Sequence, residues 1–164
     1  MFTFFIDPAC MHQHNLVVHE SALPQGQGWS PMTWQILEGA SSIPVTLFEA
    51  VSELDAGPIY LQQQLDLQGQ ELVGEWRALQ AQATLELCLG WVDRYQEVVE
   101  AAKPQLGEPS YYPRRRPDDS QLDPERSLAD QFNLLRVVDN QSYPAFFSWG
   151  GKKYSLKIHD SDAN

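Results

Sequence analysis

Apolar residues gather in three short runs, each bounded by turn residues. The runs NLVVHE (15–20), IPVTLFEAV (43–51) and PIYLQQQLDL (58–67) are rich in β-branched and large apolar side chains. Such runs predict short buried strands, because β-branched and apolar residues fit a pleated, half-buried surface. The segment SELDAG (52–57) joins the second run to the third, and its Asp-Ala-Gly sequence predicts a turn. We therefore expect a small sheet.

Two further patterns indicate helices. The segment PMTWQILEG (31–39) begins with proline and ends with glycine, an asymmetry typical of a short helix. Between Glu71 and about Ala102, apolar residues recur every three or four positions. This spacing predicts one long amphipathic helix that covers the sheet. The residues between the first strand and the first helix, 21–30, contain Pro24, Gly26 and Gly28 and predict a loop.

The remainder of the chain divides into a connecting segment and a small second unit. Residues 103–126 are rich in proline, tyrosine and charge, which favours an ordered linker on the surface. Ser127, with Asp130 three residues later, is expected to begin a helix through a variant of the capping box. The segment YPAFFSWGGKKYSLKI (143–158) predicts a hairpin that turns at Gly150-Gly151. We expect three parts, with bounds 1–102, 103–126 and 127–164.

The charge distribution excludes some partners. The chain of 164 residues has 11 basic and 22 acidic residues, a formal net charge of -11, so it repels polyanions as a whole. This balance argues against nucleic acid as a partner. Up to Pro113 there are 3 basic and 14 acidic residues, whereas the part from Arg114 onward has 8 of each. The triplet Arg114, Arg115 and Arg116 is interpreted as part of a solvated linker that pairs with neighbouring aspartates.

Cysteine content and the first residues suggest where the protein works. Cys10 and Cys88 give no disulfide framework, which suits a reducing cytoplasm. The opening MFTFFIDPAC is apolar but short and contains Asp7, so we expect neither a signal peptide nor a membrane span. Cys10, His12 and His14 lie close together in sequence, but alternating residues near a terminus rarely hold fixed geometry, and no metal site is expected.

Two polar residues at strand ends could carry chemistry. His19 ends the first predicted strand, and Asp55 lies in the turn that follows the second. Side chains from neighbouring strand ends can meet in one cleft, and a carboxylate beside an imidazole favours proton transfer near neutral pH. The alternative is that His19 is a satisfied interior histidine and that Asp55 only shapes its turn.

The sequence HESALPQGQGWSP (19–31), followed by IPVTLFEAVSELDAGPIYLQ (43–62), resembles the catalytic half of the folate-dependent formyltransferases. These share an Asn-x-His-x-Ser loop, a Leu-Pro, an Arg-Gly and a later Leu-Asp-x-Gly. The segments YYPRRRPDDSQLDP, FNLLRVV and SYPAFF are similar to the family's joint between its catalytic domain and its small C-terminal β subdomain. The resemblance implies an α/β fold, namely the C-terminal part of a Rossmann-like formyltransferase domain with a small C-terminal β-rich subdomain.

The resemblance also implies an activity and a set of site residues. It implies transfer of a formyl group from 10-formyltetrahydrofolate, used as a co-substrate, to a primary amine. His19 would stabilise the oxyanion, and Asp55 would orient His19 and help to remove the amine proton. The turn with Leu54, Asp55 and Gly57 would contact the folate. Ser21 and Trp29 are expected to bind the acceptor.

The chain departs from the family pattern at the oxyanion site and in its extent. Val17 occupies the position of the family asparagine and has no polar side chain, and Gln27 stands where the family often has arginine. The chain begins where the family is halfway through its nucleotide-fold domain. We therefore expect a truncated chain or misplaced start, or a partner that covers an exposed strand edge. The sequence leaves the existence of a homo-oligomer open.

Three functions remain as alternatives. The segment HESALPQGQGWSPMTWQILEG (19–39) is closer to the branch that formylates amino sugars carried on nucleotides than to the initiator-tRNA enzymes. The acidic balance agrees, because a tRNA enzyme needs a basic face. The second alternative is methionyl-tRNA formylation, which a basic groove around Arg114 would favour and the overall charge opposes. The third is a truncated, non-catalytic, formyltransferase-like binding protein.

Overall fold

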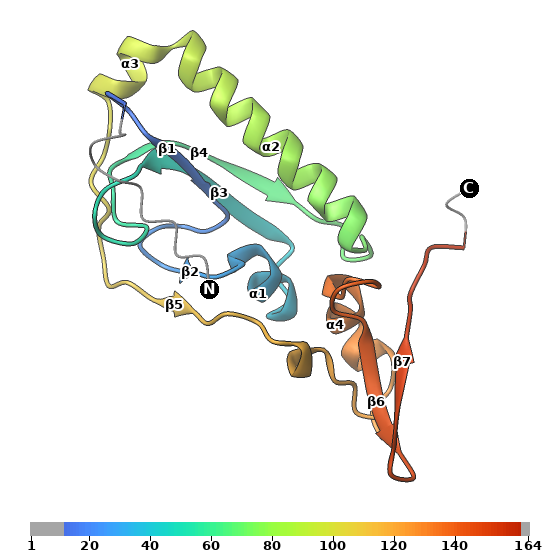
Figure 1. Cartoon of the computed structure of the whole chain (residues 1–164). Coiled ribbons are helices and arrows are strands. Elements are labelled where there is room, and N and C mark those ends of the chain that lie inside the picture. The colour runs from blue at the N-terminus through green and yellow to red at the C-terminus, as the bar shows by residue number, and fades with distance from the viewer. Residues whose placement is uncertain (1–11, 162–164) are drawn as a thin grey trace.

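A three-stranded antiparallel sheet forms the centre of the molecule. The computed structural model describes residues 12–161. The strands are β1 (Leu16–His19), β3 (Ser42–Glu49) and β4 (Ile59–Asp66), arranged in the order β1-β3-β4 (Figure 1). His19 pairs with Thr46 in the β1–β3 register. Strands β1 and β4 lie within the apolar runs that predicted them, and β3 begins one residue before its run.

The helices agree with the sequence pattern except at one point. Helix α1 (Pro31–Leu37) begins at the predicted proline, and Gly39 follows it with a φ of +88°. The expected long helix is two helices, α2 (Val73–Asp93) and α3 (Tyr95–Glu100), separated at Arg94. The expectation of one helix was wrong, because the backbone of Arg94 leaves the helical region, with φ -118° and ψ 31°. Beyond the break, Tyr95 packs edge to face on Trp91, with ring centroids 4.9 Å apart. No helix within residues 12–161 is long and apolar enough to cross a membrane.

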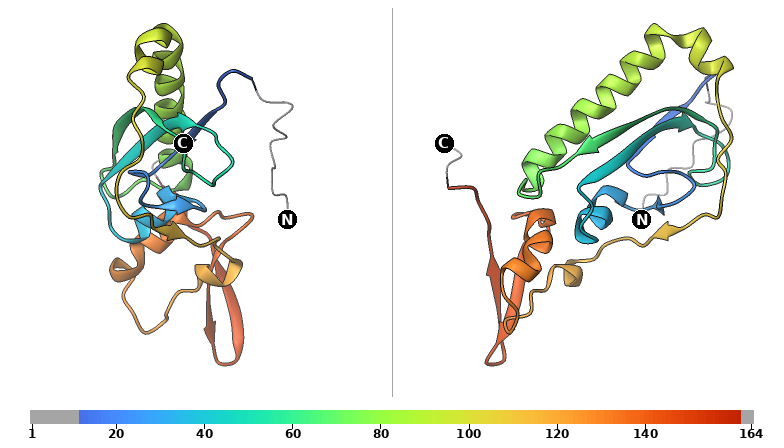
Figure 2. Two further views of the ribbon diagram at one scale, coloured as in Figure 1. Left: turned by 90° about the vertical axis from the view of Figure 1, so that its left-hand side faces the viewer. Right: turned by 180° about the vertical axis from the view of Figure 1, so that it is seen from behind.

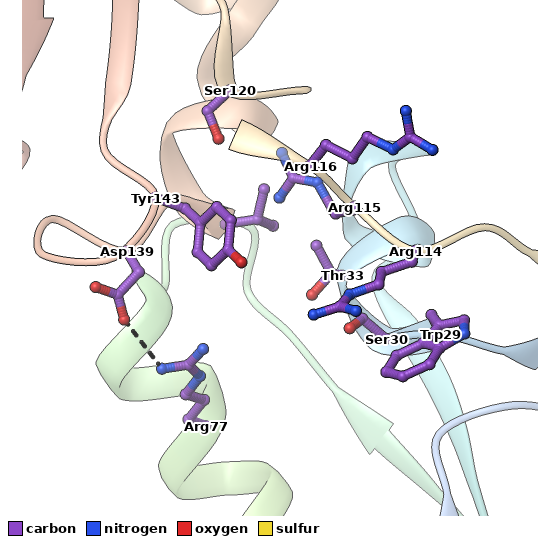
Figure 3. A pocket seen from close by; sticks show the side chains of 11 residues that line it. Trp29, Ser30, Thr33, Arg77, Arg114, Arg115, Arg116, Ser120, Asp139 and Tyr143 are labelled. Atoms are coloured by element: carbon purple, nitrogen blue, oxygen red, sulfur yellow. Dashed lines mark hydrogen bonds and ion pairs between the residues drawn. The ribbon is translucent and has the colours of Figure 1, made fainter. Parts of the chain in front are cut away.

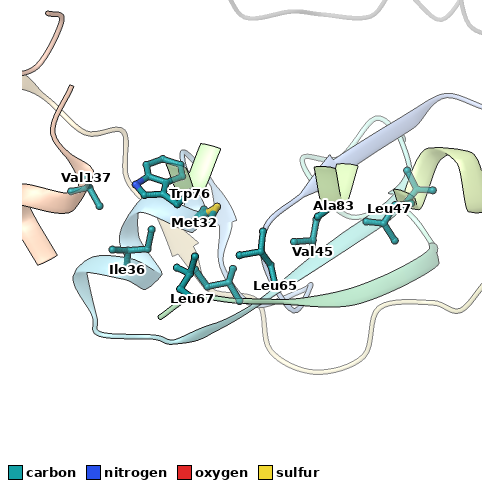
Figure 4. Packing of buried hydrophobic residues seen from close by; sticks show 11 residues of the cluster. Met32, Ile36, Val45, Leu47, Leu65, Leu67, Trp76, Ala83 and Val137 are labelled. Carbon is teal, nitrogen blue, oxygen red and sulfur yellow. The ribbon is translucent and has the colours of Figure 1, made fainter. Parts of the chain in front are cut away.

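The main core lies between the sheet, α1 and α2. Helix α2 runs along the sheet, as the view from behind shows (Figure 2). Buried apolar side chains from these elements, together with Val137 from the C-terminal part, fill the space between them (Figure 4). The cluster consists of Met32, Ile36, Ile43, Val45, Leu47, Leu65, Leu67, Trp76, Ala83, Leu87 and Val137. Burial of this apolar surface is the main stabilising contribution to the fold.

The segment 103–126 is part of the fold. It contains β5 (Tyr111–Tyr112), which pairs in parallel with β2 (Gln27–Gly28) from the loop after β1. A short 3-10 helix, η2 (Pro117–Ser120), follows. In Figure 1 this segment runs along the molecule from α3 to the C-terminal part. The segment therefore packs on the loop region beside β1 and completes it.

The C-terminal part has a small core of its own. It contains η3 (Ala129–Gln131), α4 (Phe132–Val137), β6 (Ala145–Trp149) and β7 (Lys152–Leu156). The two strands form the predicted hairpin, and both turn glycines have positive φ, +57° and +77°. The hydroxyl of Ser127 accepts the Asp130 N–H at 3.1 Å, although the regular α-helix begins only at Phe132. The second core contains Leu122, Leu135, Val138 and Ala145.

A buried ion pair joins the two parts. Arg136 on α4 is 2% exposed and donates from Nη2 to Glu71 Oε2 at 3.0 Å. Its Nε donates to the Glu71 carbonyl at 3.2 Å, and its Nη1 to Asn133 Oδ1 at 3.0 Å. The guanidinium thus satisfies three acceptors. Nearby, Trp76 Nε1 donates to the Arg136 carbonyl at 3.0 Å, so α2 and α4 are fixed by polar and apolar contacts together.

The connection between β3 and β4 contains a contact that only glycine permits. A Cβ atom on Gly57 would lie 1.7 Å from the carbonyl oxygen of Glu49, a backbone atom that cannot move away freely. Gly57 is therefore required for the chain to return close to β3 after the turn.

Removal of the buried guanidinium tests the junction between the two parts. We expect Arg136→Met to lower the free energy of unfolding by about 3–5 kcal/mol, because it leaves the Glu71 carboxylate buried without its partner. Urea denaturation measures this change. Arg126→Met, which alters an exposed arginine of the same region, should change stability by less than about 0.5 kcal/mol. Equal stability of the two variants would show that the ion pair does not hold the parts together.

Substitution of Gly57 tests the close approach at the turn. Gly57→Ala should destabilise the protein by at least about 3 kcal/mol, because the added methyl group overlaps backbone. Gly74→Ala is the matched control. Nothing lies within 4 Å of a Cβ at that helical position, so the control should leave stability unchanged or raise it by up to about 1 kcal/mol. A Gly57→Ala variant as stable as the wild type would contradict the described path of the turn.

Candidate functional site

The structure brings His19 and Asp55 together. His19 is 7% exposed at the end of β1, and its Nε2 lies 4.0 Å from Asp55 Oδ2. The nearest partner of Nε2 is the Gly26 carbonyl oxygen at 2.9 Å. Because a carbonyl oxygen only accepts, this bond requires a hydrogen on Nε2. The histidine is thus held by the loop after β1, with the carboxylate at ion-pair distance.

The turn that carries Asp55 is held from three sides. Asp55 Oδ2 accepts the Gly28 N–H at 2.9 Å. The Asp55 carbonyl accepts from the side-chain amides of Gln27 and Gln105, at 3.0 and 2.8 Å. Gln105 Nε2 also donates to the Gly57 carbonyl at 2.9 Å. Asp55 has a φ of +51°, in the left-handed backbone region that residues other than glycine rarely adopt. These hydrogen bonds stabilise that conformation.

Glycine at position 28 is needed for the same reason as at position 57. Gly28 has a φ of +98°, and a Cβ there would lie 2.6 Å from the Tyr112 carbonyl. The β2–β5 pair can therefore form only because this residue has no side chain. The backbone N–H of Gly28 donates to the Asp55 carboxylate.

Buried polar atoms without partners surround the pair. The hydroxyl of Ser21, Oε1 of Gln27 and Oε1 of Gln105 have no hydrogen-bond partner within residues 12–161. Ser21 itself is 2% exposed, and its carbonyl accepts from Thr46 Oγ1 at 2.6 Å. Unpartnered buried polar atoms are costly, and they concentrate at sites that bind something else.

The remaining predicted site residues lie in different environments. Leu54, expected to contact the folate, is 65% exposed beside Asp55. Gly57 is buried against Glu49. Ser21 packs close to Gly26, because a Cβ atom added to Gly26 would lie 2.9 Å from the Cβ atom of Ser21. Trp29 is 50% exposed and lines a separate cavity that also contains arginines.

No polar side chain replaces the family asparagine. Val17 pairs with Phe48 inside the sheet. Asn15 uses its side-chain amide to donate to the His12 carbonyl at 2.9 Å, and its backbone N–H donates to Glu49 Oε1 at 2.6 Å. The side chain of Asn15 is thus engaged at the start of β1, away from His19.

His14 belongs to a polar and aromatic cluster. Its Nδ1 lies 3.0 Å from Glu49 Oε2, which also accepts from the Tyr60 hydroxyl at 2.6 Å. Burial raises the pKa of Glu49, but hydrogen bonds from Tyr60, Asn15 and His14 outweigh it and the pKa is lowered overall. Within residues 12–161, no group of three His, Cys, Asp or Glu side chains could hold a metal ion, and Cys10 lies outside these residues.

A cavity rich in arginine lies beside Trp29. Its volume is about 260 Å³, and it opens between α1, η2 and the start of the C-terminal part (Figure 3). Arg77 pairs with Asp139 across it at 3.4 Å, and the Arg114 guanidinium lies 5.1 Å from the centre of the Trp29 ring. The other residues that line it are Ser30, Thr33, Arg115, Arg116, Ser120, Val137 and Tyr143.

Sequence reasoning missed Gln105 and the role of the Gly26 carbonyl. Gln105 lies 50 residues from Asp55, within a segment whose composition indicated only a linker. No local pattern reports such a long-range amide contact. The Gly26 carbonyl is a backbone atom, and its position depends on the loop conformation alone.

Proteins similar to this chain in sequence or structure include formyltransferases. No family model matches the chain. A methionyl-tRNA formyltransferase from Thermodesulfovibrio yellowstonii is 29% identical over 119 residues, which are 73% of this chain and 39% of that protein. The chain therefore spans well under half the length of this curated relative.

Solved structures show the same fold. A methionyl-tRNA formyltransferase from Clostridium thermocellum matches with a TM-score of 0.66 and 23% identity, over 92% of this chain and 65% of that one. A sugar N-formyltransferase from a Shewanella species gives 0.63 and 19%, over 87% and 60%. HypX from Aquifex aeolicus, in complex with tetrahydrofolic acid, gives 0.62 and 20%, over 88% and 25%. The chain has the α/β fold of the formyltransferases and corresponds to the C-terminal part of that fold.

Proposed function

We propose that this chain takes part in transfer of a formyl group from 10-formyltetrahydrofolate to the primary amine of a nucleotide-linked amino sugar. The observation that carries the proposal is the 4.0 Å approach of His19 to Asp55 in a turn fixed by three hydrogen-bond donors. The fold agrees, since it is that of formyltransferases and one structural neighbour, HypX, is in complex with tetrahydrofolic acid.

The two side chains would divide the chemistry. The amine attacks the formyl carbon, and negative charge develops on the formyl oxygen. The Nε2 hydrogen of His19 is donated to the Gly26 carbonyl in this structure, and His19 would stabilise the charge by redirecting that hydrogen to the formyl oxygen, as oxyanion donors do. Gly28 occupies Oδ2 of Asp55, so Oδ1 is the oxygen that would accept the amine proton through water. When the bond between the formyl carbon and the folate nitrogen breaks, that nitrogen takes up the proton returned from Asp55 through water, and tetrahydrofolate leaves.

The folate would lie against the turn of Leu54, Asp55 and Gly57. Leu54 is exposed and offers an apolar surface, whereas the unpartnered oxygens of Gln27 and Gln105 offer acceptors for the N–H groups of a pterin ring. Ser21 would contribute its unpartnered hydroxyl close to His19. This division into an apolar contact and a few polar ones is typical of small-molecule sites.

Two other functions remain. Methionyl-tRNA as the acceptor is favoured by the curated relative, a methionyl-tRNA formyltransferase, but is opposed by the net charge of -11. A binding protein without catalysis is favoured by Val17, because a missing oxyanion donor costs about 10²–10³ in rate. A measurement of whether formyl transfer accompanies folate binding distinguishes methionyl-tRNA formylation from binding without catalysis.

Binding of a folate analogue tests the proposal. In calorimetric titration of the 164-residue chain with 5-formyltetrahydrofolate, we expect saturable heat and a rise in melting temperature. Asp55→Asn should weaken binding by at least about tenfold, because it removes a charged acceptor that fixes the turn. The matched control Asp93→Asn changes an exposed aspartate and should bind as the wild type does.

Transfer is then measured with an amine acceptor. His19→Asn should lower the rate by at least about 100-fold, and the exposed His12→Asn should not change it. Neither heat nor a thermal shift with the folate analogue would contradict the proposal. Binding without any transfer would leave the non-catalytic alternative.

A further inference from the structure

Four arginines surround a single cavity in an acidic protein. Arg77, Arg114, Arg115 and Arg116 all line the cavity beside Trp29, and they are four of only 11 basic residues in a chain of net charge -11 (Figure 3). Asp139 is the single carboxylate among the lining residues. This concentration of positive charge is unfavourable by itself, and a bound anion would relieve it.

Neighbouring carboxylates do not neutralise the triplet. Within residues 12–161, only Arg77 of the four arginines has an ion-pair partner, Asp139. Asp119 influences Arg115 electrostatically, but its Oδ2 accepts the backbone N–H of Arg116 at 2.5 Å, and Arg115 bonds only the Asp119 carbonyl. The expectation that nearby aspartates form ion pairs with this triplet was therefore wrong, whereas Arg114 and Arg116 are exposed, as expected of a solvated segment.

The cavity also contains polar atoms that lack partners. Arg115 Nε and Ser120 Oγ are buried and have no hydrogen-bond partner within the described residues. Ser120 is 1% exposed, although it lines the cavity. Burial lowers the pKa of Arg115, while Asp119 opposes this change, so its cation is partly removed from water. A guanidinium and a hydroxyl, both with unused donors, are well suited to a phosphate oxygen.

A second cavity among the described residues lacks both the excess of arginines and the buried polar atoms without partners. It has a similar volume, about 270 Å³, and lies beside α4. Its charged lining residues are Asp123, Arg126 and Asp130, so they carry a net negative charge. None of its lining side chains has a buried polar atom without a partner within residues 12–161.

We propose that the arginine cavity binds the phosphate or diphosphate group of the formyl acceptor. At about 260 Å³, it is smaller than the range of about 300–1,000 Å³ typical of sites for whole drug-sized ligands, so it fits one end of a larger molecule. The cavity by itself supports the binding of an anion, whereas the assignment of that anion to the formyl acceptor rests on the proposed function.

The position of the cavity relative to Asp55 supports the assignment. Gly28 donates its N–H to the Asp55 carboxylate, and Trp29, the next residue, lines the cavity. Across the β2–β5 pair, Tyr112 is two residues from Arg114. An acceptor with its phosphate among the arginines would thus extend along β2 and β5 toward the His19–Asp55 pair.

Titration with inorganic pyrophosphate tests the site. At fixed low ionic strength, we expect the 164-residue chain to bind pyrophosphate with saturation at one site. Arg115→Gln should weaken binding by at least about tenfold, since it removes a charged donor. Arg94→Gln, which makes the same charge change at an exposed position outside the cavity, should have no effect. Because Arg115 is partly buried, the exposed Arg114→Gln is a second variant, and circular dichroism confirms that each variant folds.

The source of the phosphate is resolved by competition. Uridine diphosphate should displace pyrophosphate, and a single-stranded RNA oligonucleotide at equal phosphate concentration should not. Displacement by RNA but not by the diphosphate would overturn the assignment to a small acceptor. Absence of saturable binding, or equal binding by the Arg114, Arg115 and Arg94 variants, would overturn the site itself. Since no folate is present, failure here is distinct from failure of the proposed formyl transfer.

Discussion

The turn that carries Asp55 is the constraint on which the rest of the candidate site depends. The residue adopts a left-handed backbone, and donors from the loop after β1 and from the segment after α3 hold it there. Such a conformation costs free energy and persists only when its surroundings over-determine it. Two glycines, at 28 and 57, provide the close backbone approaches that make those contacts sterically feasible.

The β2–β5 pair links the candidate catalytic residues to the arginine cavity. Each of its two strands has only two residues, which is short for a β-strand, but Gly28 and Tyr112 both have a second role. Gly28 binds Asp55, and Tyr112 stacks on Trp34 with an interplanar angle of 8° and donates to Glu38 Oε2 at 2.8 Å. Burial and the bond to Glu38 raise the pKa of Tyr112 to about 12, so its hydroxyl remains a donor at neutral pH.

Most of the regular structure could be predicted from local sequence, whereas contacts between distant residues could not. The strands, α1 and the Gly150-Gly151 hairpin follow from apolar runs and turn residues close in sequence. The break at Arg94 is a change of backbone conformation within an apolar pattern that continues past it, and the pairing of β5 with β2 joins residues more than 80 apart. The approach of His19 to Asp55 agrees with the hypothesis from motif resemblance. The hydrogen bond between His19 and Gly26 and the contact of Gln105 with Asp55 could not be predicted from any local sequence pattern.

The course of residues 103–126 has a consequence for exchange of parts between related proteins. This stretch looks like a tether, yet its Gln105 amide bonds the Asp55 turn, and its arginines line the cavity. A chimera that replaced everything after α3 with the equivalent piece of another protein would therefore exchange parts of the candidate site and of the arginine cavity along with the C-terminal hairpin. A junction placed after η2 would keep Gln105 and the arginine triplet, but it would still exchange Val137, Asp139 and Tyr143 of the cavity wall and the Arg136 partner of Glu71.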